Sequence, residues 1–245
     1  MPTPRPVSVL TGLRDLVLPG GCAGCGAVTD RQRYGVCPDC VAAVRRLRPA
    51  PTRPVPPPPG LPPCAALGGY GGVLRELVIG YKDRGRHRLA RPLGRLLAAV
   101  VTSLLAPSSG PGAPVLLVPV PDTPAAARAR HGDHLWRLAR WCAAALRQQG
   151  RPVLLTRPLR ARPRPDSTTL SSDERLRAAR AALRVRPLRV TGVRYRLAAR
   201  PMPVILLDDV VTTGATLAAA ADRLAAAGVP VTGAAVLAAT RRTGG

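Results

Sequence analysis

Two adjacent acids followed by a loop of small and hydroxyl-bearing residues are the first group in this sequence that could do chemistry. Asp208 and Asp209 follow the apolar run Val204–Leu207, whose length and branching are typical of a buried parallel strand. The loop after them contains Thr212, Thr213, Gly214, Ala215 and Thr216. An alanine-rich stretch then predicts a helix, so the loop would lie where unpaired N–H groups and the helix dipole favour a phosphate.

The two acids make physical sense beside a phosphate site if they bind hydroxyl groups. A carboxylate and a phosphate repel each other, whereas a carboxylate accepts hydrogen bonds from a diol. A ribose 5-phosphate has vicinal hydroxyls on one side and a phosphate on the other. The alternative is an ordinary strand, loop and helix in which a threonine caps the helix.

The stretch Val204–Thr216 resembles the phosphoribosyl diphosphate (PRPP) signature of type I phosphoribosyltransferases, in which two acids and Thr-Thr-Gly-x-Thr follow a hydrophobic strand. The resemblance implies that Asp208 and Asp209 are the catalytic acids and hold the ribose hydroxyls. It implies that Thr212–Thr216 surround the 5-phosphate, and that Mg2+ accompanies PRPP as the cofactor.

Four cysteines are the second group with a recognisable chemistry. Cys22 and Cys25 form one C-x2-C pair, and Cys37 and Cys40 form another after eleven intervening residues. Pairs at this separation can place four thiolates tetrahedrally around a zinc ion. Two disulfides or a redox pair are the alternatives; a cytoplasmic chain disfavours the first, and no strand–helix unit around either pair supports the second. Because four protein ligands leave no open position, we expect a structural zinc.

The charge of the chain favours phosphate-bearing ligands. Its 245 residues carry a formal net charge of +24, from 37 Lys and Arg against 13 Asp and Glu. Such an excess attracts a sugar phosphate or a nucleic acid. Aromatic residues make up 2% of the chain, which gives little support to a base-stacking platform. No apolar run reaches the length of about 18 residues that a membrane span needs, and charged residues interrupt any secretory signal, so we expect a cytoplasmic protein without membrane insertion.

The hydrophobic pattern predicts the elements that would position these groups. Besides Val204–Leu207, strands are expected at Pro114–Asp122, Val153–Leu155 and Val231–Ala238. Helices are expected at Val7–Leu18, after Tyr70, and at His87–Leu105, Leu135–Gln148 and Thr216–Ala227. Of two Arg-rich segments, Arg157–Ser172 suits a mobile flap and Val185–Arg200 a hairpin or loop. Strand–helix–strand crossovers around one phosphate loop predict an α/β fold with an open, mainly parallel sheet and a ligand at the carboxyl ends of its strands.

The order of these features narrows the resemblance. A zinc knuckle, a helix ending in Lys-x-x-Gly at Lys82 and a phosphoribosyltransferase core follow one another as in the ComF family, whose members are linked to uptake of single-stranded DNA in natural transformation. On this layout residues 1–48 hold an N-terminal helix and the zinc knuckle, 49–64 form a proline-rich linker, and 65–241 form the phosphoribosyltransferase-like domain. The linker would be an extended, semi-rigid spacer without a core of its own.

The resemblance also implies a site for the diphosphate of PRPP, after the strand that begins at Pro114. Its residues would be Val120, Pro121, Asp122, Arg128 and Arg130. Basic side chains there would offset negative charge on the leaving group, and the alternative is a solvated Arg-rich loop. A further hypothesis makes His134, in the same segment, a base.

Two functions follow as expectations. The first is a ComF-like phosphoribosyltransferase that binds PRPP with Mg2+ and transfers the phosphoribosyl group to a nitrogenous base with release of pyrophosphate. The second is a non-catalytic adaptor that binds a nucleotide or single-stranded DNA and works with proteins of the competence machinery.

Overall fold

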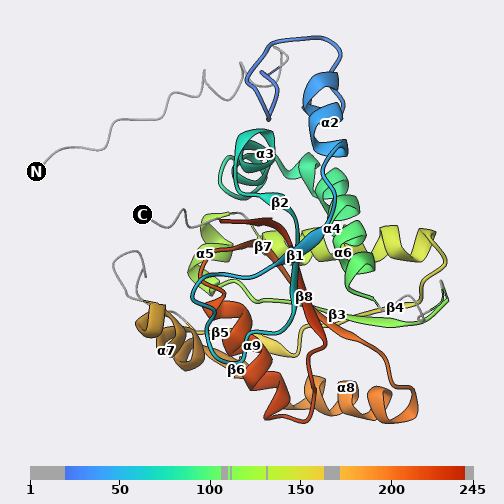
Figure 1. Cartoon of the computed structure of the whole chain (residues 1–245), viewed down its shortest axis with the longest axis vertical. Coiled ribbons are helices and arrows are strands. Elements are labelled where there is room, and N and C mark those ends of the chain that lie inside the picture. The colour runs from blue at the N-terminus through green and yellow to red at the C-terminus, as the bar shows by residue number, and fades with distance from the viewer. Residues whose placement is uncertain (1–19, 106–109, 111, 131, 163–171, 241–245) are drawn as a thin grey trace, which may run out of the picture.

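Apolar runs that are far apart in the sequence lie side by side in one six-stranded sheet, with the order β1-β2-β8-β7-β3-β4 (Figure 1). In the computed structural model, residues 20–105, 110, 112–130, 132–162 and 172–240 are described. The strands of this sheet are β1 (Ala50–Thr52), β2 (Cys64–Gly69), β3 (Val115–Pro119), β4 (Val153–Leu155), β7 (Val204–Val211) and β8 (Gly233–Ala239). All pair in parallel except β1, which is antiparallel to β2. The expected α/β fold with a mainly parallel sheet is confirmed.

The central strands are apolar because helices cover both of their faces. Every residue of β3 and of β8 is buried, as is the Val204–Leu207 run of β7. Strands buried on both sides read as continuous hydrophobic runs without alternation. This is why the sequence showed them so clearly.

The connections divide at the middle of the sheet. The chain leaves β3 through α5 (Pro124–Ala129) and α6 (His134–Gln148) towards β4, and it leaves β7 through α9 (Ala215–Ala225) towards β8. Because parallel crossovers are right-handed, α6 and α9 lie on opposite faces of the sheet. The loops after β3 and β7 therefore part from each other and leave a crevice at the carboxyl ends of the strands, where open α/β sheets bind ligands.

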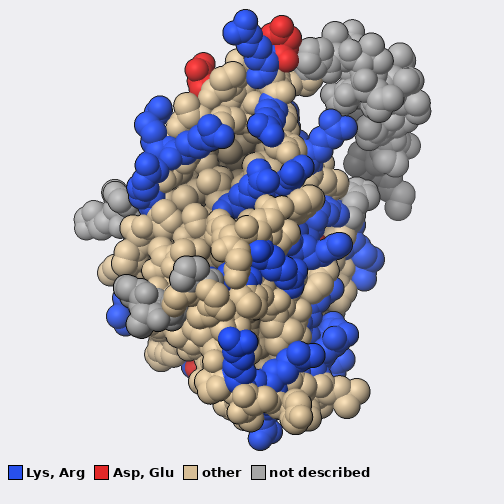
Figure 2. Space-filling view, turned by 90° about the vertical axis from the view of Figure 1, so that its right-hand side faces the viewer, with Lys and Arg blue, Asp and Glu red and all other residues tan. Residues whose placement is uncertain are grey.

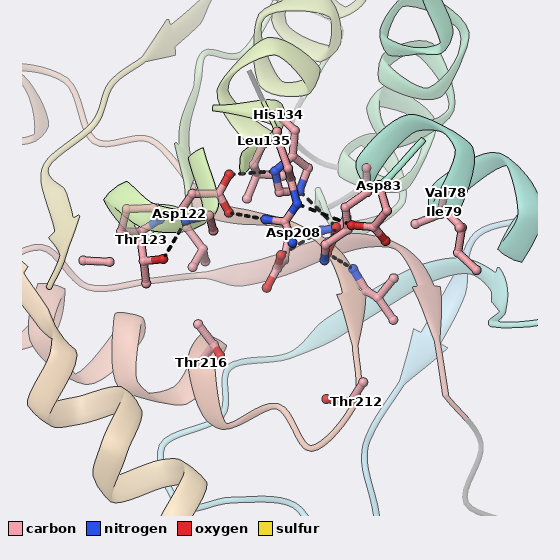
Figure 3. Close-up of a pocket in the computed structure, with 18 of the residues that line it drawn as sticks. Val78, Ile79, Asp83, Asp122, Thr123, His134, Leu135, Asp208, Thr212 and Thr216 are labelled. Carbon is pink, nitrogen blue, oxygen red and sulfur yellow. Dashed lines mark hydrogen bonds and ion pairs between the residues drawn. The ribbon is translucent and has the colours of Figure 1, made fainter. Parts of the chain in front are cut away.

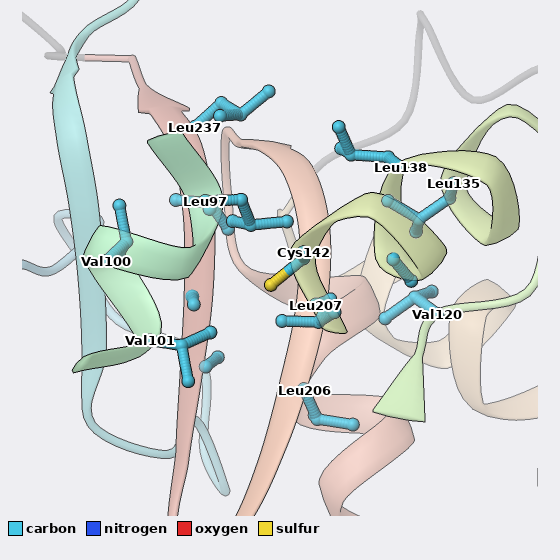
Figure 4. Close-up of a cluster of buried hydrophobic side chains, with 14 of the residues drawn as sticks. Leu97, Val100, Val101, Val120, Leu135, Leu138, Cys142, Leu206, Leu207 and Leu237 are labelled. Carbon is cyan, nitrogen blue, oxygen red and sulfur yellow. The ribbon is translucent and has the colours of Figure 1, made fainter. Parts of the chain in front are cut away.

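Helix α4 (Ala90–Leu104) packs with α6 over one face of the sheet (Figures 1 and 4). Figure 4 shows the side chains between these helices and the strands, among them Leu97, Val101, Leu138, Cys142, Leu207 and Leu237. The two helices approach closely at Gly94, where an added Cβ would lie 2.5 Å from the Cβ of Trp141. This tight contact fixes the start of α6, which carries part of the candidate site.

Three N-terminal helical elements contact one another in a row that leads to α4. They are α2 (Pro38–Arg45), α3 (Gly72–Lys82) and the 3-10 turn η1 (His87–Leu89). Helix α3 lies between the cysteine segment and the sheet, and its last residue, Lys82, reaches the carboxyl ends of the strands. The helix expected over Val7–Leu18 lies outside the described residues.

The proline-rich segment doubles back and packs on the rest of the molecule instead of forming an extended spacer, because Thr52 in β1 lies opposite Cys64 in the antiparallel β2. Its first residues form β1 at the edge of the sheet. An added Cβ at Gly214, which has φ +74°, would lie 3.0 Å from Cδ1 of Leu61 and 3.3 Å from Cγ of Pro54. At Gly60 an added Cβ would lie 2.3 Å from Oδ1 of Asp222 in α9. The segment thus lies against the loop after β7 and against α9.

Two local expectations are wrong. The hairpin or loop at Val185–Arg200 is instead helix α8 (Pro187–Ala199), with proline in its first turn, where a missing N–H costs little. The strand expected at Val204–Leu207 does not end before the two acids, because β7 continues through Asp208 and Asp209 to Val211. The segment Arg157–Ser172, expected as a flap, begins with β5 (Leu159–Ala161), which pairs with β6 (Leu183–Val185) after α7 (Ser172–Ala182). Residues 163–171 lie outside the described part, so the flap stays a prediction.

Candidate functional site

The four cysteines of the two C-x2-C pairs come together in a single cluster. The Sγ atoms of Cys22, Cys25, Cys37 and Cys40 all lie within 4.8 Å of one another, and Cys25 and Cys37 are 3.7 Å apart. Zinc–sulfur bonds of about 2.3 Å in a tetrahedron place sulfur atoms about 3.8 Å apart. All four cysteines are free thiols in the structure, so the cluster could hold a metal ion.

Backbone N–H groups beside the cluster favour a thiolate at Cys22. The N–H groups of Cys37 and Gly24 donate to Sγ of Cys22, at 3.2 and 3.3 Å. Burial alone would raise the pKa of the Cys22 thiol, but these donors outweigh it and lower that pKa to about 6. Thiolates are the form of cysteine that binds zinc, so the donor set fits a structural Zn2+ ion.

A second group of polar residues surrounds a cavity of about 480 Å3 at the carboxyl ends of β3 and β7 (Figure 3). Of the predicted site residues, eight line it: Val120, Pro121, Asp122, Arg130, Asp208, Asp209, Thr212 and Thr216. Among the described residues, the lining does not include the predicted Arg128, Thr213, Gly214 and Ala215. The topology therefore brings two segments, about ninety positions apart in the sequence, to one crevice.

Asp209 is the most enclosed acid of this cavity. Its side chain is 5% exposed, and its Oδ2 lies 2.7 Å from Nζ of Lys82 and 3.1 Å from Nε2 of His134. Its Oδ1 accepts the N–H of Val210 at 2.8 Å. Burial would raise the pKa of Asp209, but the hydrogen bond and charge of His134 and the charge of Lys82 outweigh burial and lower it.

His134 joins the two sides of the crevice. While Nε2 faces Asp209 on β7, Nδ1 lies 2.6 Å from Oδ2 of Asp122 on the loop after β3. Burial opposes a charge on the imidazole, but the hydrogen bonds to the two carboxylates raise the pKa of His134 to about 9. At neutral pH the ring is an imidazolium that donates from both nitrogens, which does not suit the hypothesis of a base.

Arg130 adds a third cation to this end of the cavity. Its guanidinium lies 3.5 Å from Asp122 and 3.4 Å from Asp83, and its side chain is 23% exposed. Lys82, Arg130 and His134 thus face Asp83, Asp122 and Asp209. The three positive charges therefore offset these three negative charges without a ligand.

Asp208 has different surroundings from its neighbour. Successive side chains of a strand point to opposite faces, so Asp208 points away from α6, and it is partly exposed to the cavity. One of its oxygens accepts the N–H of Asp209 at 2.8 Å. Burial and the nearby Asp209 carboxylate raise the pKa of Asp208.

The loop after β7 leads into α9 through a left-handed glycine. Gly214 is the N-cap of α9 with φ +74°, and as a glycine it has no side chain to accept a hydrogen bond there. The hydroxyl of Thr213 lies 3.4 Å from the N–H of Ala215. Thr212 and Thr216 face the cavity from the two ends of this loop (Figure 3). The start of α9 therefore offers backbone N–H groups and hydroxyls to a ligand in the cavity.

The sequence did not identify two charged residues of the cavity, Lys82 and Asp83. Lys82 was named as the lysine of the Lys-x-x-Gly that ends a predicted helix, with no role at the site, although it is also the single lysine among 37 basic residues. That rarity was a usable signal, because a chain that replaces lysine with arginine everywhere else keeps it at this one position. Asp83 had no comparable signal.

No protein-family model matches the chain, and a search of curated proteins also finds no similar one. Among the described residues, none of the helices has the length and apolar character that crossing a membrane requires.

Proposed function

We propose that this protein is a ComF-like phosphoribosyltransferase that binds the magnesium complex of PRPP and transfers its phosphoribosyl group to a nitrogenous base. The observation that carries the proposal is the pairing of Asp208 and the Thr212–Thr216 loop, at the end of β7, with Asp122 and Arg130, at the end of β3, around one cavity. This supports a ligand with hydroxyls between two separate phosphate groups, and PRPP has that form.

The residues divide the ligand among them. Asp208 accepts hydrogen bonds from the ribose hydroxyls, with Asp209 behind it. The N–H groups at the start of α9, with Thr212 and Thr216, bind the 5-phosphate. Arg130 faces the diphosphate, with Val120 and Pro121 lining the same end of the cavity. Mg2+ bound with PRPP would supply positive charge that offsets the diphosphate.

The reaction needs positioning and charge stabilisation more than proton transfer. The bond between ribose C1 and the diphosphate oxygen breaks, and its electron pair leaves with pyrophosphate. A nitrogen of the base forms the new bond to C1 and gives up its proton to solvent. Fixed cations beside the leaving group, and a carboxylate beside the cationic ribose, stabilise the charges that develop.

Calorimetric titration with Mg-PRPP tests the proposal. We expect micromolar binding by the wild type, weakened at least tenfold in Asp208→Asn, because an amide is a poorer acceptor for the ribose hydroxyls than a carboxylate. Asp30→Asn removes an equal charge at an exposed position outside the cavity and should bind as the wild type does. Pyrophosphate release with a panel of nitrogenous bases then identifies the acceptor. A folded, zinc-loaded wild type that does not bind Mg-PRPP would contradict the proposal.

The basic surface favours a second candidate function, a non-catalytic adaptor that binds a nucleotide or single-stranded DNA alongside competence-machinery proteins. Figure 2 shows Lys and Arg side chains spread over one face, with few Asp or Glu among them. Helix α8 exposes three arginines, Arg189, Arg194 and Arg196, and its C-cap residue Arg200 is exposed as well. Such a surface would neutralise a phosphate backbone and make binding depend steeply on salt.

Fluorescence anisotropy with a labelled oligothymidine at increasing salt tests the adaptor function. Replacing Arg194 and Arg196 with Gln should weaken binding and reduce its salt dependence, whereas Asp208→Asn should leave both unchanged. No binding at low salt would exclude this candidate.

A further inference from the structure

We propose that Lys82 contacts the substrate: its ammonium group moves from Asp209 to the diphosphate of PRPP when PRPP binds. Asp209 then positions Lys82 instead of holding the ribose. The inference rests on the proposed function and deepens it, because it divides the adjacent acids between two roles.

Lys82 is placed to reach a ligand. It is the last residue of α3 and lines the cavity, with its side chain 28% exposed, while the carboxylate that it contacts is only 5% exposed. Its ammonium is therefore at the boundary between the buried anion and the open cavity. A ligand can approach Lys82 without disturbing the strand.

The position of Lys82 matches the diphosphate end of the cavity. Lys82 shares Asp209 with His134 there, and both His134 and Arg130 contact Asp122 on the loop after β3. In Figure 3, Thr212 and Thr216 lie on the opposite side of the cavity from His134 and Asp122. A ligand with its 5-phosphate at the start of α9 would carry its second phosphate group towards these cations.

Asp209 has little capacity left for ribose hydroxyls. Its Oδ1 accepts the N–H of Val210, and its Oδ2 already faces both Lys82 and His134. Asp208, on the opposite face of β7, is partly exposed and has an oxygen free of such ion pairs among the described residues. The geometry therefore assigns the ribose to Asp208 alone.

The exchange leaves no buried charge without a partner. When Lys82 moves to a phosphate oxygen, His134 remains 3.1 Å from Asp209 and still compensates its charge. A lysine suits this exchange because its ammonium is a compact charge on a flexible stem, whereas a guanidinium binds a carboxylate in a fixed, two-pronged geometry. This gives a physical reason for the single lysine in an otherwise arginine-only set of cations.

The test compares two ligands that differ only in the diphosphate. Calorimetry measures the Kd of Mg-PRPP and of ribose 5-phosphate for the wild type, Lys82→Met and Lys82→Arg. Lys82→Met should weaken Mg-PRPP binding about tenfold to hundredfold, because it removes one charged hydrogen bond, and leave ribose 5-phosphate binding within about twofold. Lys82→Arg should restore part of the affinity for Mg-PRPP. Arg84→Met, which removes a positive charge from an exposed position two residues away, should change neither value.

The Asp209→Asn variant tests whether Asp209 positions Lys82 or holds the ribose. If Asp209 positions Lys82, this variant loses affinity for Mg-PRPP only, and the loss in the double variant with Lys82→Met is smaller than the sum of the single losses. If Asp209 holds the ribose, ribose 5-phosphate binding falls as well, and that part of the inference is wrong. Circular dichroism and zinc content verify that each variant is folded; should Asp209→Asn fail to fold, the Lys82 series alone decides.

The outcomes distinguish a failure of this inference from a failure of the proposed function on which it rests. A wild type that binds neither ligand contradicts both. A wild type that binds both ligands, while Lys82→Met weakens them equally or not at all, contradicts only the role of Lys82.

Discussion

The cysteine cluster and the strand-end cavity are both built from side chains that bind charged ligands, but they are assembled in different ways. The four thiols come from positions 22–40, and a few tight turns bring them within 4.8 Å of one another. The charged groups of the cavity come from α3, the loop after β3, α6 and β7, and they meet only because the sheet places those elements together. The first site is built within one short segment of the chain, and the second depends on the packed core.

The two regions are also in contact, so a change in one of them could affect the other. An added Cβ at Gly80 in α3 would lie 3.9 Å from Cβ of Ala23, and Arg86 donates to the carbonyl of Gly21 at 2.7 Å. Helix α3 thus touches the cysteine segment and ends at Lys82 in the cavity. Variants in each region show whether the two sites behave independently.

The largest effect is expected from removing a metal ligand. Cys40→Ser should abolish stoichiometric zinc and unfold the knuckle, since structural zinc contributes about 10–16 kcal/mol of apparent binding free energy in small zinc domains. Elemental analysis gives the zinc content, and far-ultraviolet circular dichroism shows whether the sheet persists. Cys64→Ser, at a buried cysteine outside the cluster, should retain zinc. Loss of the sheet together with the zinc would show that the two regions form one cooperative unit.

The next effect concerns the buried acid of the cavity. Asp209→Ala leaves Lys82 and His134 without their shared anion, and we expect it to lower the free energy of unfolding by about 3–5 kcal/mol in a denaturant titration. Asp208→Asn removes a carboxylate that is disfavoured beside Asp209, so stability should change by less than about 1 kcal/mol. Equal losses in the two variants would contradict the division between the acids.

A smaller effect depends on pH. Because the pKa of His134 rises from 6.5 to about 9 in the folded state, its contribution to stability is complete below pH 6.5 and disappears as the pH increases through about 9. The difference in unfolding free energy between the wild type and His134→Gln should therefore be larger at pH 6 than at pH 10. A nuclear magnetic resonance titration of the His134 ring measures the pKa directly. A value near 6.5 would mean that the two carboxylates do not hold the imidazolium.

The smallest effect tests the packing between the two regions. An added Cβ at Gly24 would lie 2.8 Å from Sγ of Cys40 and 2.9 Å from Cγ1 of Val73 in α3. Gly24→Ala should cost about 1–3 kcal/mol without removing any metal ligand. Gly26→Ala does not serve as a control, because Gly26 has φ +77°, whereas Gly71, with open space around its Cβ position, does. If Gly24→Ala also weakened Mg-PRPP binding, the knuckle would influence the cavity through α3.

The sequence predicted the parts of the molecule that local patterns determine. Continuous apolar runs revealed β3, β7 and β8, and the cysteine spacing indicated the cluster. Helix α8 was missed because only Val190 and Val193 are buried on it, so its apolar pattern is weak between many arginines. The pairing of β5 with β6 was missed because each has three residues and a helix separates them.

The candidate site was predictable where one segment supplies it and unpredictable where several meet. Asp208, Asp209, Thr212 and Thr216 belong to one motif that lines the cavity. That Lys82 faces Asp209, or that His134 joins Asp209 to Asp122, follows from how α3 and α6 pack over the sheet. Spacing along the chain carries no trace of these distances, so only the folded arrangement could show that the two acids differ.

The contact of Leu61 and Pro54 with Gly214 limits how this chain can be shortened. A fragment that starts at Cys64 would remove the strand that covers one edge of the sheet and the apolar cover of the loop before α9. The sheet and the strand-end cavity should therefore be produced together with the proline-rich segment. Insertions and fusion points belong elsewhere, because residues that read as a spacer form one wall of the loop on which ligand binding is proposed to depend.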